Sequence, residues 1–312
     1  GLEKVMKVYL SEYIYPPARE KLAQVAEIVD NFDHIEELDA IILRNIPVTA
    51  EMLGRAKNLK VIAKHGIGVN TIDIKAARER GVQVIYTPTA NAESVAEMTV
   101  GLILNLERRI YEANVKSRNS EFKTIAPEDF LGTELQGKVF GQIGMGNIAQ
   151  RIARIMSAGF GAKVLGYDPF VSQEEAAKRG FEWVATLEEL LERSDMVNIN
   201  VPLVKSTEHM ISGKVFDHFK PSAVFVNAAR GAVISEDDLY DALVAGKLKA
   251  AACDTFVKEP PTAENKLLSL PNFSATPHLG GNTEDALRNA GTEVVEETLK
   301  VLAGGTPVHP VP

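Results

Sequence analysis

The sequence has 312 residues, enough for two ordinary domains with sizeable cores. Its 45% apolar and 24% charged residues are typical of a globular protein. The net charge of −8 at pH 7 argues against a general nucleic-acid-binding or anionic-membrane-binding surface.

The sequence also bears on the cellular compartment and on metal binding. No stretch is long and apolar enough to span a bilayer, and the N-terminal sequence lacks a basic-then-apolar signal pattern. The single cysteine, Cys253, lies in the apolar run 250–254 and is expected to be a buried structural thiol. No Cys/His cluster suggests a metal site. We therefore expect a cytoplasmic protein without a bound metal.

The first ninety residues alternate short apolar runs with helical patterns. Helices are expected at 17–25, 49–56 and 72–80, with Thr49, and Thr71 followed by Asp73, as plausible helix starts. This alternation is typical of a parallel sheet covered on both faces, so the segment is predicted to be a small doubly wound domain. Its strands are expected at 5–10, 26–30, 40–43, 60–63 and 82–86.

Residues 91–110 have apolar positions that recur at helical spacing, without a proline. We expect one long helix here that leaves the first domain and enters a second. Residues 119–136 follow as a less regular segment containing Pro127 and Gly132. This segment is expected to lie over a surface or a partner subunit.

A glycine pattern opens the second domain. The run 139–143 reads as a strand, and a helix is expected to begin near Asn147. Between and just beyond these points, Gly144, Gly146 and Ala149 give the spacing G-x-G-x-x-A. Gly144 allows a tight turn, Gly146 leaves room for a pyrophosphate, and the first helical amides face that anion. The pattern predicts a dinucleotide-binding site.

The next strand, 163–167, ends on Asp168, which is placed to accept hydrogen bonds from an adenosine ribose. Residues 169–172 supply no arginine or lysine for a 2′-phosphate, and Asp168 itself would repel one. NAD is therefore expected rather than NADP. An ordinary βα turn is the alternative, but strand, turn, helix, strand and acid together favour the nucleotide site.

Beyond Asp168 the alternation of strand and helix continues. A second long helix is expected over 283–303, followed by an extended proline-rich tail. Two long helices flanking the fingerprint region suggest an insertion, with 1–95 and 287–312 as one domain and 96–286 as the other. The remaining strands of the second domain are expected at 182–184, 196–200, 223–227, 249–253 and 273–276.

Reactive side chains follow three of these later strands. Arg230, Glu259 and His278 are expected at one rim of one sheet, because parallel strands end at the same edge. Carbonyl reduction by a nicotinamide enzyme needs a cation that holds the substrate and a protonated imidazole that supplies the proton. A carboxylate beside that imidazole would favour its charged form and fix its tautomer.

Each of the three also has a structural interpretation. Arg230 could be a surface ion-pair partner, Glu259 could stand in a solvated turn, and His278 could be a structural histidine. Their occurrence together, after successive strands downstream of the glycine pattern, argues against that interpretation. The other histidines are read as structural: His34, His65, His209, His218 and His309.

These motifs resemble the D-isomer-specific 2-hydroxyacid dehydrogenases, which include phosphoglycerate, glycerate/hydroxypyruvate and D-lactate dehydrogenases. The resemblance spans essentially the whole chain. It implies a Rossmann NAD domain inserted into a flavodoxin-like substrate domain, an active site in a closing cleft, and a homodimer formed through the NAD domains. The matching motifs are Gly144-x-Gly146-x-x-Ala149, Asn227-x-x-Arg230-Gly231, Asp254-x-Phe256-x-x-Glu259-Pro260, Pro277-His278-Leu279-Gly280-Gly281, Gly66-Ile67-Gly68 and Asn91-x-x-Ser94-Val95-Ala96-Glu97.

The resemblance also implies a role for each matching residue. Arg230 resembles the substrate-binding arginine, Glu259 the carboxylate partner and His278 the acid/base. Backbone amides of residues 66–69 would hold the substrate carboxylate, so Gly66, Ile67 and Gly68 are substrate-binding candidates. The implied cofactor-binding residues are Gly144, Gly146, Asn147, Ile148, Asp168, Pro202, Thr207, Ala228, Asp254 and Gly280.

The sequence departs from the family pattern at two places. After Gly68 the family usually has an Asp-Asn pair, and here the pair is Asn70-Thr71. The strand end before Pro202 often carries histidine, and here it carries Asn200. The first departure bears on substrate choice or loop geometry.

Basic residues in the first domain leave two interpretations open. Arg44, Lys64 and His65 could bind a distal anionic group of a substrate, such as a phosphate or sulfonate. They could equally be ordinary surface charges.

Two functions of different classes remain. The leading hypothesis is an NAD-dependent dehydrogenase of a D-2-hydroxy acid and its 2-keto acid, of the hydroxypyruvate, glycerate or phosphoglycerate type. The alternative is an NAD-responsive binding protein, like the transcriptional corepressors that resemble this family. The absence of basic regions disfavours it, and only turnover can decide, because fold does not fix function. The expected partners are a small-molecule acid and a second copy of the chain.

Overall fold

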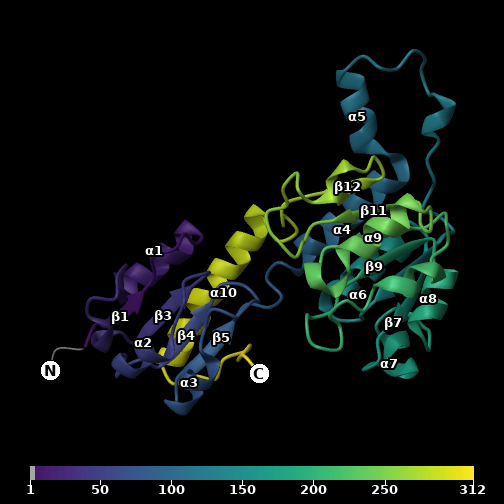
Figure 1. Ribbon diagram of the computed structural model, residues 1–312. Helices are drawn as coiled ribbons and strands as arrows, with labels where there is room; N and C mark the ends of the chain where they lie inside the picture. The colour runs from purple at the N-terminus through teal and green to yellow at the C-terminus, as the bar shows by residue number, and fades with distance from the viewer. Residues whose placement is uncertain (1–3) are drawn as a thin grey trace. The chain divides into compact units, whose positions relative to one another are not determined.

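The computed structural model describes residues 4–312, which divide into two compact units (Figure 1). One unit contains residues 4–91 and 282–312, and the other contains residues 92–281. Each is a parallel sheet with helices on both faces, which confirms the predicted fold class. Among the described residues no helix is long and apolar enough to cross a membrane.

The unit of residues 4–91 and 282–312 has a five-stranded sheet in the order β2-β1-β3-β4-β5, the flavodoxin-like order. The two strands β3 and β4 are buried throughout, as expected when helices cover both faces of a sheet. The strands are β1 (Met6–Tyr9), β2 (Ala26–Val29), β3 (Ala40–Leu43), β4 (Val61–Lys64) and β5 (Gln83–Tyr86).

Four helices cover this sheet. On one face lie α1 (Pro16–Val25) and α10 (Glu284–Leu302), and on the other lie α2 (Ala50–Arg55) and α3 (Ile74–Glu79). The expected cap Thr49 is present, because it accepts from the Met52 amide at 3.2 Å. At the start expected around Thr71 and Asp73, Asp73 is the cap and accepts from the Ala76 amide at 2.9 Å, whereas the Thr71 hydroxyl has no partner among residues 4–312. A short helix, η1 (Ile35–Glu37), precedes β3. The C-terminal tail pairs with the free edge of β5, where the Val311 amide donates to the Val84 carbonyl at 2.9 Å.

The unit of residues 92–281 has a seven-stranded sheet in the order β12-β11-β10-β9-β6-β7-β8. The chain runs outward from β6 to one edge and then from β9 to the other. This Rossmann arrangement places a switch point between β6 and β9. The strands are β6 (Val139–Ile143), β7 (Lys163–Tyr167), β8 (Glu182–Trp183), β9 (Met196–Ile199), β10 (Val224–Asn227), β11 (Ala250–Cys253) and β12 (Phe273–Ala275).

Helices again cover both faces of this sheet. On one face lie α4 (Ala92–Arg108), α6 (Asn147–Arg154) with its π-helical extension η3 (Ile155–Gly159), and α7 (Gln173–Lys178). On the other lie α8 (Leu187–Arg193) and α9 (Glu236–Val244). Cys253 is completely buried, as predicted for a structural thiol. Short helices join these elements: η2 (Glu128–Phe130), η4 (Gly213–His218), η5 (Gly231–Val233) and η6 (Lys266–Ser269).

The expectation of one helix over 91–110 is wrong at its C-terminal end. The chain kinks at Arg109, whose φ of 51° is left-handed, before α5 (Ile110–Arg118) begins. The Arg109 guanidinium pairs with both oxygens of Glu112, donates to the Asp129 carbonyl and lies 3.8 Å from the centre of the Phe130 ring. Contacts with residues about twenty positions away therefore stabilise the kink, and helical spacing could not predict them.

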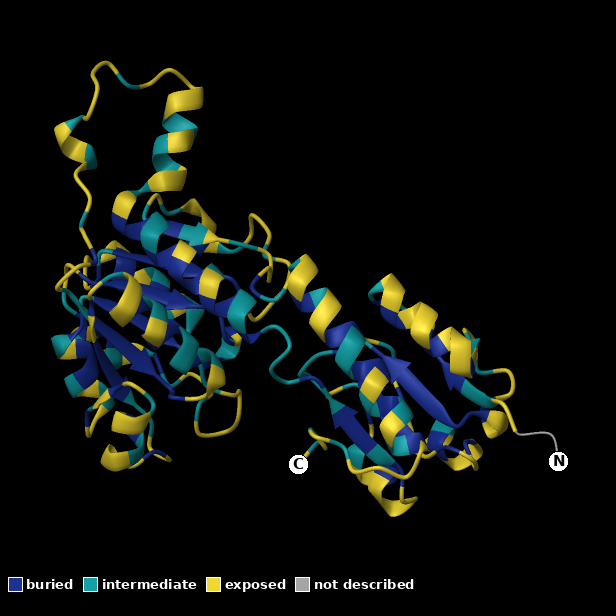
Figure 2. Cartoon of the chain, turned by 180° about the vertical axis from the view of Figure 1, so that it is seen from behind, coloured by how far each residue is buried: buried dark blue, intermediate teal, exposed yellow. Residues whose placement is uncertain are grey.

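We call residues 110–131 the arm. Figure 1 shows α5 and the following loop projecting away from the sheet of their unit. The helix α5 buries none of its residues, and Tyr111, Ile125 and Leu131 are exposed. Figure 2 accordingly shows the arm mostly in the colours of exposed and intermediate residues, whereas the strands of the unit are mostly buried.

Candidate active site

Three adjacent strands bring the predicted reactive residues to one edge of the larger sheet. The register pairs Asn227 of β10 with Cys253 of β11, and Cys253 with Ala275 of β12. The chain leaves all three strands at their carboxyl ends, where ligands bind in open α/β sheets. Arg230, Glu259 and His278 lie in the segments that follow.

His278 and Glu259 form a direct pair. The imidazole Nδ1 lies 2.7 Å from a carboxylate oxygen of Glu259, and the other oxygen accepts from the Phe256 amide at 3.1 Å. The His278 side chain is 50% exposed and that of Glu259 is 34% exposed. A carboxylate on Nδ1 leaves the other ring nitrogen as the one available to a ligand.

Asp254 fixes the loop that carries His278. It is 1% exposed, and its side chain accepts from the Thr276 hydroxyl at 2.6 Å and from the amides of Leu279 and Gly280 at 2.8 and 2.9 Å. Its carbonyl accepts from the His278 amide at 2.8 Å. These bonds hold His278 at a φ of 58°, which a non-glycine residue adopts only when its surroundings enforce it.

Sequence reasoning assigned Asp254 to cofactor binding and missed this positioning role. A usable signal was present, since an acid directly after a buried apolar strand must find hydrogen-bond donors nearby.

Arg230 lies in a turn shaped by its neighbours. The Asn227 side chain donates to the Arg230 carbonyl at 3.0 Å and accepts from the Ala229 amide at 3.1 Å. A Cβ on Gly231 would lie 2.1 Å from the Phe256 carbonyl carbon, so only glycine lets this turn pack against the segment leading to Glu259. Arg230 is exposed and makes no ion pair within residues 4–312. Its guanidinium is available to an anion.

The glycine loop fits a dinucleotide pyrophosphate. Gly144 has a φ of 89°, and a Cβ there would lie 2.0 Å from the Asn200 carbonyl oxygen. A Cβ on Gly146 would meet no atom within 4 Å, which leaves open space in front of the loop. Gly146 is the N-cap of α6 and provides no side-chain cap, so the amides of Asn147 and Ile148 remain available to an anion.

Asp168 stands beside this loop at the end of β7. One carboxylate oxygen accepts from the Met145 amide and the other from the Phe170 amide, both at 3.0 Å. Sequence reasoning overlooked Arg179, which donates to the Met145 carbonyl at 2.9 Å. Glu175 pairs with Arg179 at 2.8 Å and offsets its charge.

The other cofactor-binding candidates also follow strands at this edge. Thr207 donates to the Pro202 carbonyl at 2.5 Å and accepts from the Val204 amide at 2.9 Å, which closes the turn after β9. Ala228 is buried after β10, and the Gly280 amide is held by Asp254.

The substrate-carboxylate loop lies in the unit of residues 4–91 and 282–312, after β4. Gly66 has a φ of 125°, and its amide donates to the Thr87 hydroxyl at 2.8 Å. The Gly66 amide is thus already bonded, contrary to its expected availability. In the described part of the chain the amides of Ile67, Gly68 and Val69 have no hydrogen-bond partner.

Lys64 and His65 are buried rather than being surface charges. Burial, together with the positive charge of Arg44, lowers the pKa of Lys64 and lowers that of His65 to about 4. The His65 Nε2 is buried without a partner among residues 4–312. Burial would raise the pKa of Glu12, but hydrogen bonds from three backbone amides, beginning with that of Arg44, outweigh it and lower the pKa.

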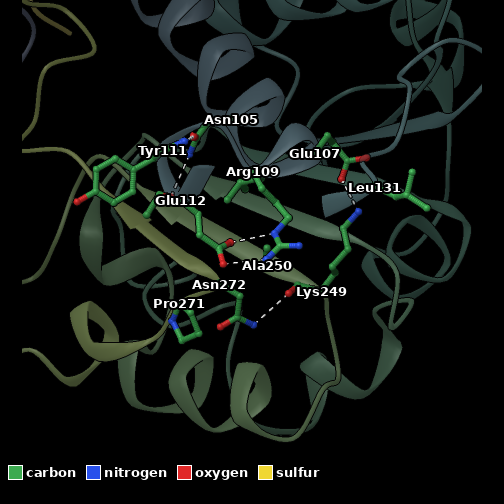
Figure 3. A pocket seen from close by; sticks show the side chains of 12 residues that line it. Asn105, Glu107, Arg109, Tyr111, Glu112, Leu131, Lys249, Ala250, Pro271 and Asn272 are labelled. Carbon is green, nitrogen blue, oxygen red and sulfur yellow. Dashed lines mark hydrogen bonds and ion pairs between the residues drawn. The ribbon is translucent and has the colours of Figure 1, made fainter. Parts of the chain in front are cut away.

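A cavity of about 350 Å³ lies at the opposite, amino end of the larger sheet, beside the root of the arm (Figure 3). Glu107 is 3% exposed there and lies 3.0 Å from the Lys249 ammonium, and burial raises the pKa of Glu107. Since Lys249 precedes β11, this cavity is separate from the edge that carries His278. It is lined by Asn105, Leu106, Glu107, Arg109, Tyr111, Glu112, Leu131, Lys249, Ala250, Pro271, Asn272 and Ser274.

Comparison with known proteins agrees with this geometry. Residues 100–280 match the family model described as D-isomer specific 2-hydroxyacid dehydrogenase, NAD binding domain. Hydroxypyruvate reductase of Thermotoga maritima is 38% identical over 95% of this chain and 98% of its own length. D-3-phosphoglycerate dehydrogenase of Methanocaldococcus jannaschii is 38% identical over 96% of this chain and 58% of its own length.

Most of the similar curated relatives are longer, and the chain spans about half of their length. Among solved structures, D-lactate dehydrogenase of Lactobacillus jensenii with NAD⁺ superposes with a TM-score of 0.84 at 26% identity, covering 98% of this chain and 100% of that one. The chain belongs to the D-isomer-specific 2-hydroxyacid dehydrogenase family, and its residues 100–280 match that family's NAD-binding domain.

Proposed function

We propose that this chain catalyses hydride transfer between NAD(H) and a D-2-hydroxy acid or its 2-keto acid. The observation that carries the proposal is the 2.7 Å pair of His278 and Glu259, on the sheet whose first strand leads into the glycine loop. The names of the similar proteins point to hydroxypyruvate, glycerate or phosphoglycerate as the type of substrate.

When held at the glycine loop, NADH would supply the hydride for reduction. Arg230 binds the keto acid and draws electron density toward its carbonyl oxygen. The protonated His278 donates its proton to that oxygen as negative charge develops there. Glu259 holds the imidazole in one orientation through Nδ1 and stabilises its charged form. In the oxidation direction, neutral His278 accepts the hydroxyl proton.

The unit of residues 4–91 and 282–312 carries groups that suit an anion. The free amides of Ile67, Gly68 and Val69 would bind the substrate carboxylate. Arg44 follows β3, and Lys64 ends the neighbouring strand β4. Neither side chain makes an ion pair within residues 4–312. Both would favour a substrate with a distal phosphate or sulfonate.

A panel of 2-keto acids with NADH, followed by loss of NADH absorbance, tests the activity. The panel should pair acids that carry a distal anionic group with neutral acids of similar size. Turnover of at least one keto acid supports the proposal. Tight NADH binding without turnover of any would instead support the NAD-responsive binding protein, which nothing in residues 4–312 favours.

We also propose that 96–286 fold as one domain and that 1–95 with 287–312 fold as the other. The separate hydrophobic clusters of the two units support this division. A fragment of 96–286 should fold and bind NADH without catalysing. A fragment that stays unfolded with NADH present would contradict the proposed boundaries.

A homodimer formed through residues 92–281 is the proposed assembly. The arm supports it, because α5 buries no residue, and the exposed Tyr111, Ile125 and Leu131 would become buried in an interface with a second copy. Sedimentation of the full chain and of an Ile125→Asp, Leu131→Asp variant tests this. We further propose a cytoplasmic location, which suits the unpaired Cys253.

A further inference from the structure

Three carboxamide side chains lie together at the switch point of the larger sheet. Gln142 of β6 and Asn198 of β9 are completely buried, and Asn200, directly after β9, is half-buried. The side-chain NH₂ group of Asn198 donates to the side-chain oxygen of Gln142 at 2.9 Å and to that of Asn200 at 2.7 Å. The side-chain NH₂ group of Gln142 donates to the same Asn200 oxygen at 3.1 Å and to the backbone carbonyl of Ile143 at 3.2 Å.

This network allows only one orientation of the Asn200 carboxamide. The Ile143 carbonyl can only accept, so the Gln142 atom facing it must be the amide nitrogen. That nitrogen also faces Asn200, which must therefore present its oxygen to Gln142 and Asn198. The Asn200 NH₂ group consequently points away from both. It has no hydrogen-bond partner among residues 4–312, and a half-buried residue remains within reach of a ligand.

Asn200 is also part of the wall of the glycine loop. The backbone amide of Asn200 donates to the backbone carbonyl of Ile143 at 2.8 Å, just before the loop. A Cβ on Gly144 would lie 2.0 Å from the Asn200 carbonyl oxygen, so the two backbones are in direct contact. The oriented NH₂ group thus lies beside the turn that meets the dinucleotide, at the switch point where such ligands bind.

We propose that the Asn200 NH₂ group donates a hydrogen bond to an oxygen of the diphosphate–ribose segment that joins adenosine to nicotinamide, and that Gln142 positions it. The polar atoms that a diphosphate–ribose segment offers are oxygens, which can accept from a side chain whose free end is donor-only. A fixed donor costs no side-chain ordering when the ligand binds. The inference rests on NAD binding by this unit, which titration of the wild type tests separately.

Calorimetric titration of the full chain with NADH is the first experiment. Asn200→Asp keeps the oxygen for both internal donors but replaces the NH₂ group with a second oxygen, and Asn200→Leu keeps the volume without a donor or a charge. Both should weaken NADH binding, on the order of 10-fold for Leu and more for Asp. Asn272→Asp is the control, because Asn272 lies at the amino end of the same sheet and donates only to the Lys249 carbonyl at 3.0 Å.

Thermal unfolding of each variant separates binding from folding. If Asn200→Asp does not fold, Asn200→Leu alone carries the test. If either variant folds like the wild type and binds NADH equally well, Asn200 is merely structural and the proposal is wrong. A wild type that fails to bind NADH would instead contradict the proposed function.

Two further sets of titrations identify the acceptor oxygen and test the positioning role of Gln142. Titration with ADP and with ADP-ribose separates the two possible oxygens, since a loss with both ligands identifies the diphosphate and a loss with ADP-ribose alone identifies the second ribose. Gln142→Met should weaken NADH binding less than Asn200→Leu, and the double variant should bind no more weakly than Asn200→Leu alone. Additive effects would show that Gln142 does not act through Asn200.

Discussion

The carboxyl ends of the two sheets place polar groups in contrasting environments. After β11 and β12 of the larger sheet, Glu259 and His278 pair directly in a setting where the imidazole is 50% exposed. At the end of β4 in the smaller sheet, Lys64 and His65 are 7% and 8% exposed. Burial lowers the pKa of both, to about 4 for His65.

This difference separates an imidazole that a ligand can reach from one that burial keeps neutral. The His278 ring is accessible and has a carboxylate partner. His65 is neutral at every pH well above 4, because burial and the neighbouring Arg44 and Lys64 disfavour its charge. The two histidines should therefore respond differently to the same substitutions and to the same change of pH.

Loss of the His278 imidazole should have the largest effect. His278→Ala removes the proposed proton donor and should lower turnover on the order of 10²-fold or more, with NADH affinity largely kept. Steady-state kinetics and an NADH titration measure the two quantities. His218→Ala is the control, because His218 forms a similar 2.8 Å pair with Glu192 elsewhere in the unit. Full turnover by His278→Ala would place the proton donor elsewhere.

His65 should instead affect acid stability. Its folded pKa of about 4 lies below the ordinary 6.5, so the unfolded chain binds the extra proton first as the pH falls. Stability should fall by about 2 kcal/mol between pH 7 and pH 5, and His65→Gln should remove most of that loss. Urea unfolding at both pH values measures it, with the exposed His34→Gln as control. Equal losses in wild type and His65→Gln would contradict the buried neutral state.

The sequence predicted the parts of this comparison that depend on local pattern. Strand ends are visible as apolar runs that stop, so the positions of Arg230 and His278 after β10 and β12 could be predicted. The cap Thr49 and the helix start around Thr71 and Asp73 could also be predicted, because a cap acts within its own helical turn.

Features that depend on distant residues could not be predicted. The kink at Arg109 requires Asp129 and Phe130, and the orientation of Asn200 requires Gln142. The burial of Lys64 was left open for the same reason, since a strand end can face solvent or protein.

The cofactor prediction concerns the larger sheet alone. NADH should bind better than NADPH, because Asp168 repels a 2′-phosphate and the charge of Arg179 is offset by Glu175. Asp168→Ala should narrow the difference on the order of 10-fold, as expected for loss of a charge-assisted hydrogen bond to the ribose. Calorimetry with both cofactors measures this, and the exposed Asp241→Ala serves as control. Equal affinities of the wild type for both would contradict the assignment.

The smallest expected effect is the one most specific to the pair of His278 and Glu259. Glu259→Gln keeps a group that can hydrogen-bond Nδ1 but removes the negative charge that favours the imidazolium. Reduction needs that imidazolium, so the alkaline limit of keto-acid reduction should move to lower pH, with activity kept at acid pH.

A pH–rate profile of wild type and variant measures this shift, and Glu192→Gln provides a matched control because it disrupts the His218 pair in the same way. An unchanged profile in Glu259→Gln would show that the carboxylate orients His278 without influencing its protonation. A profile that moves in both variants would trace the shift to the net charge of the protein. Only a shift confined to Glu259→Gln shows that Glu259 controls the protonation of His278 in the reaction.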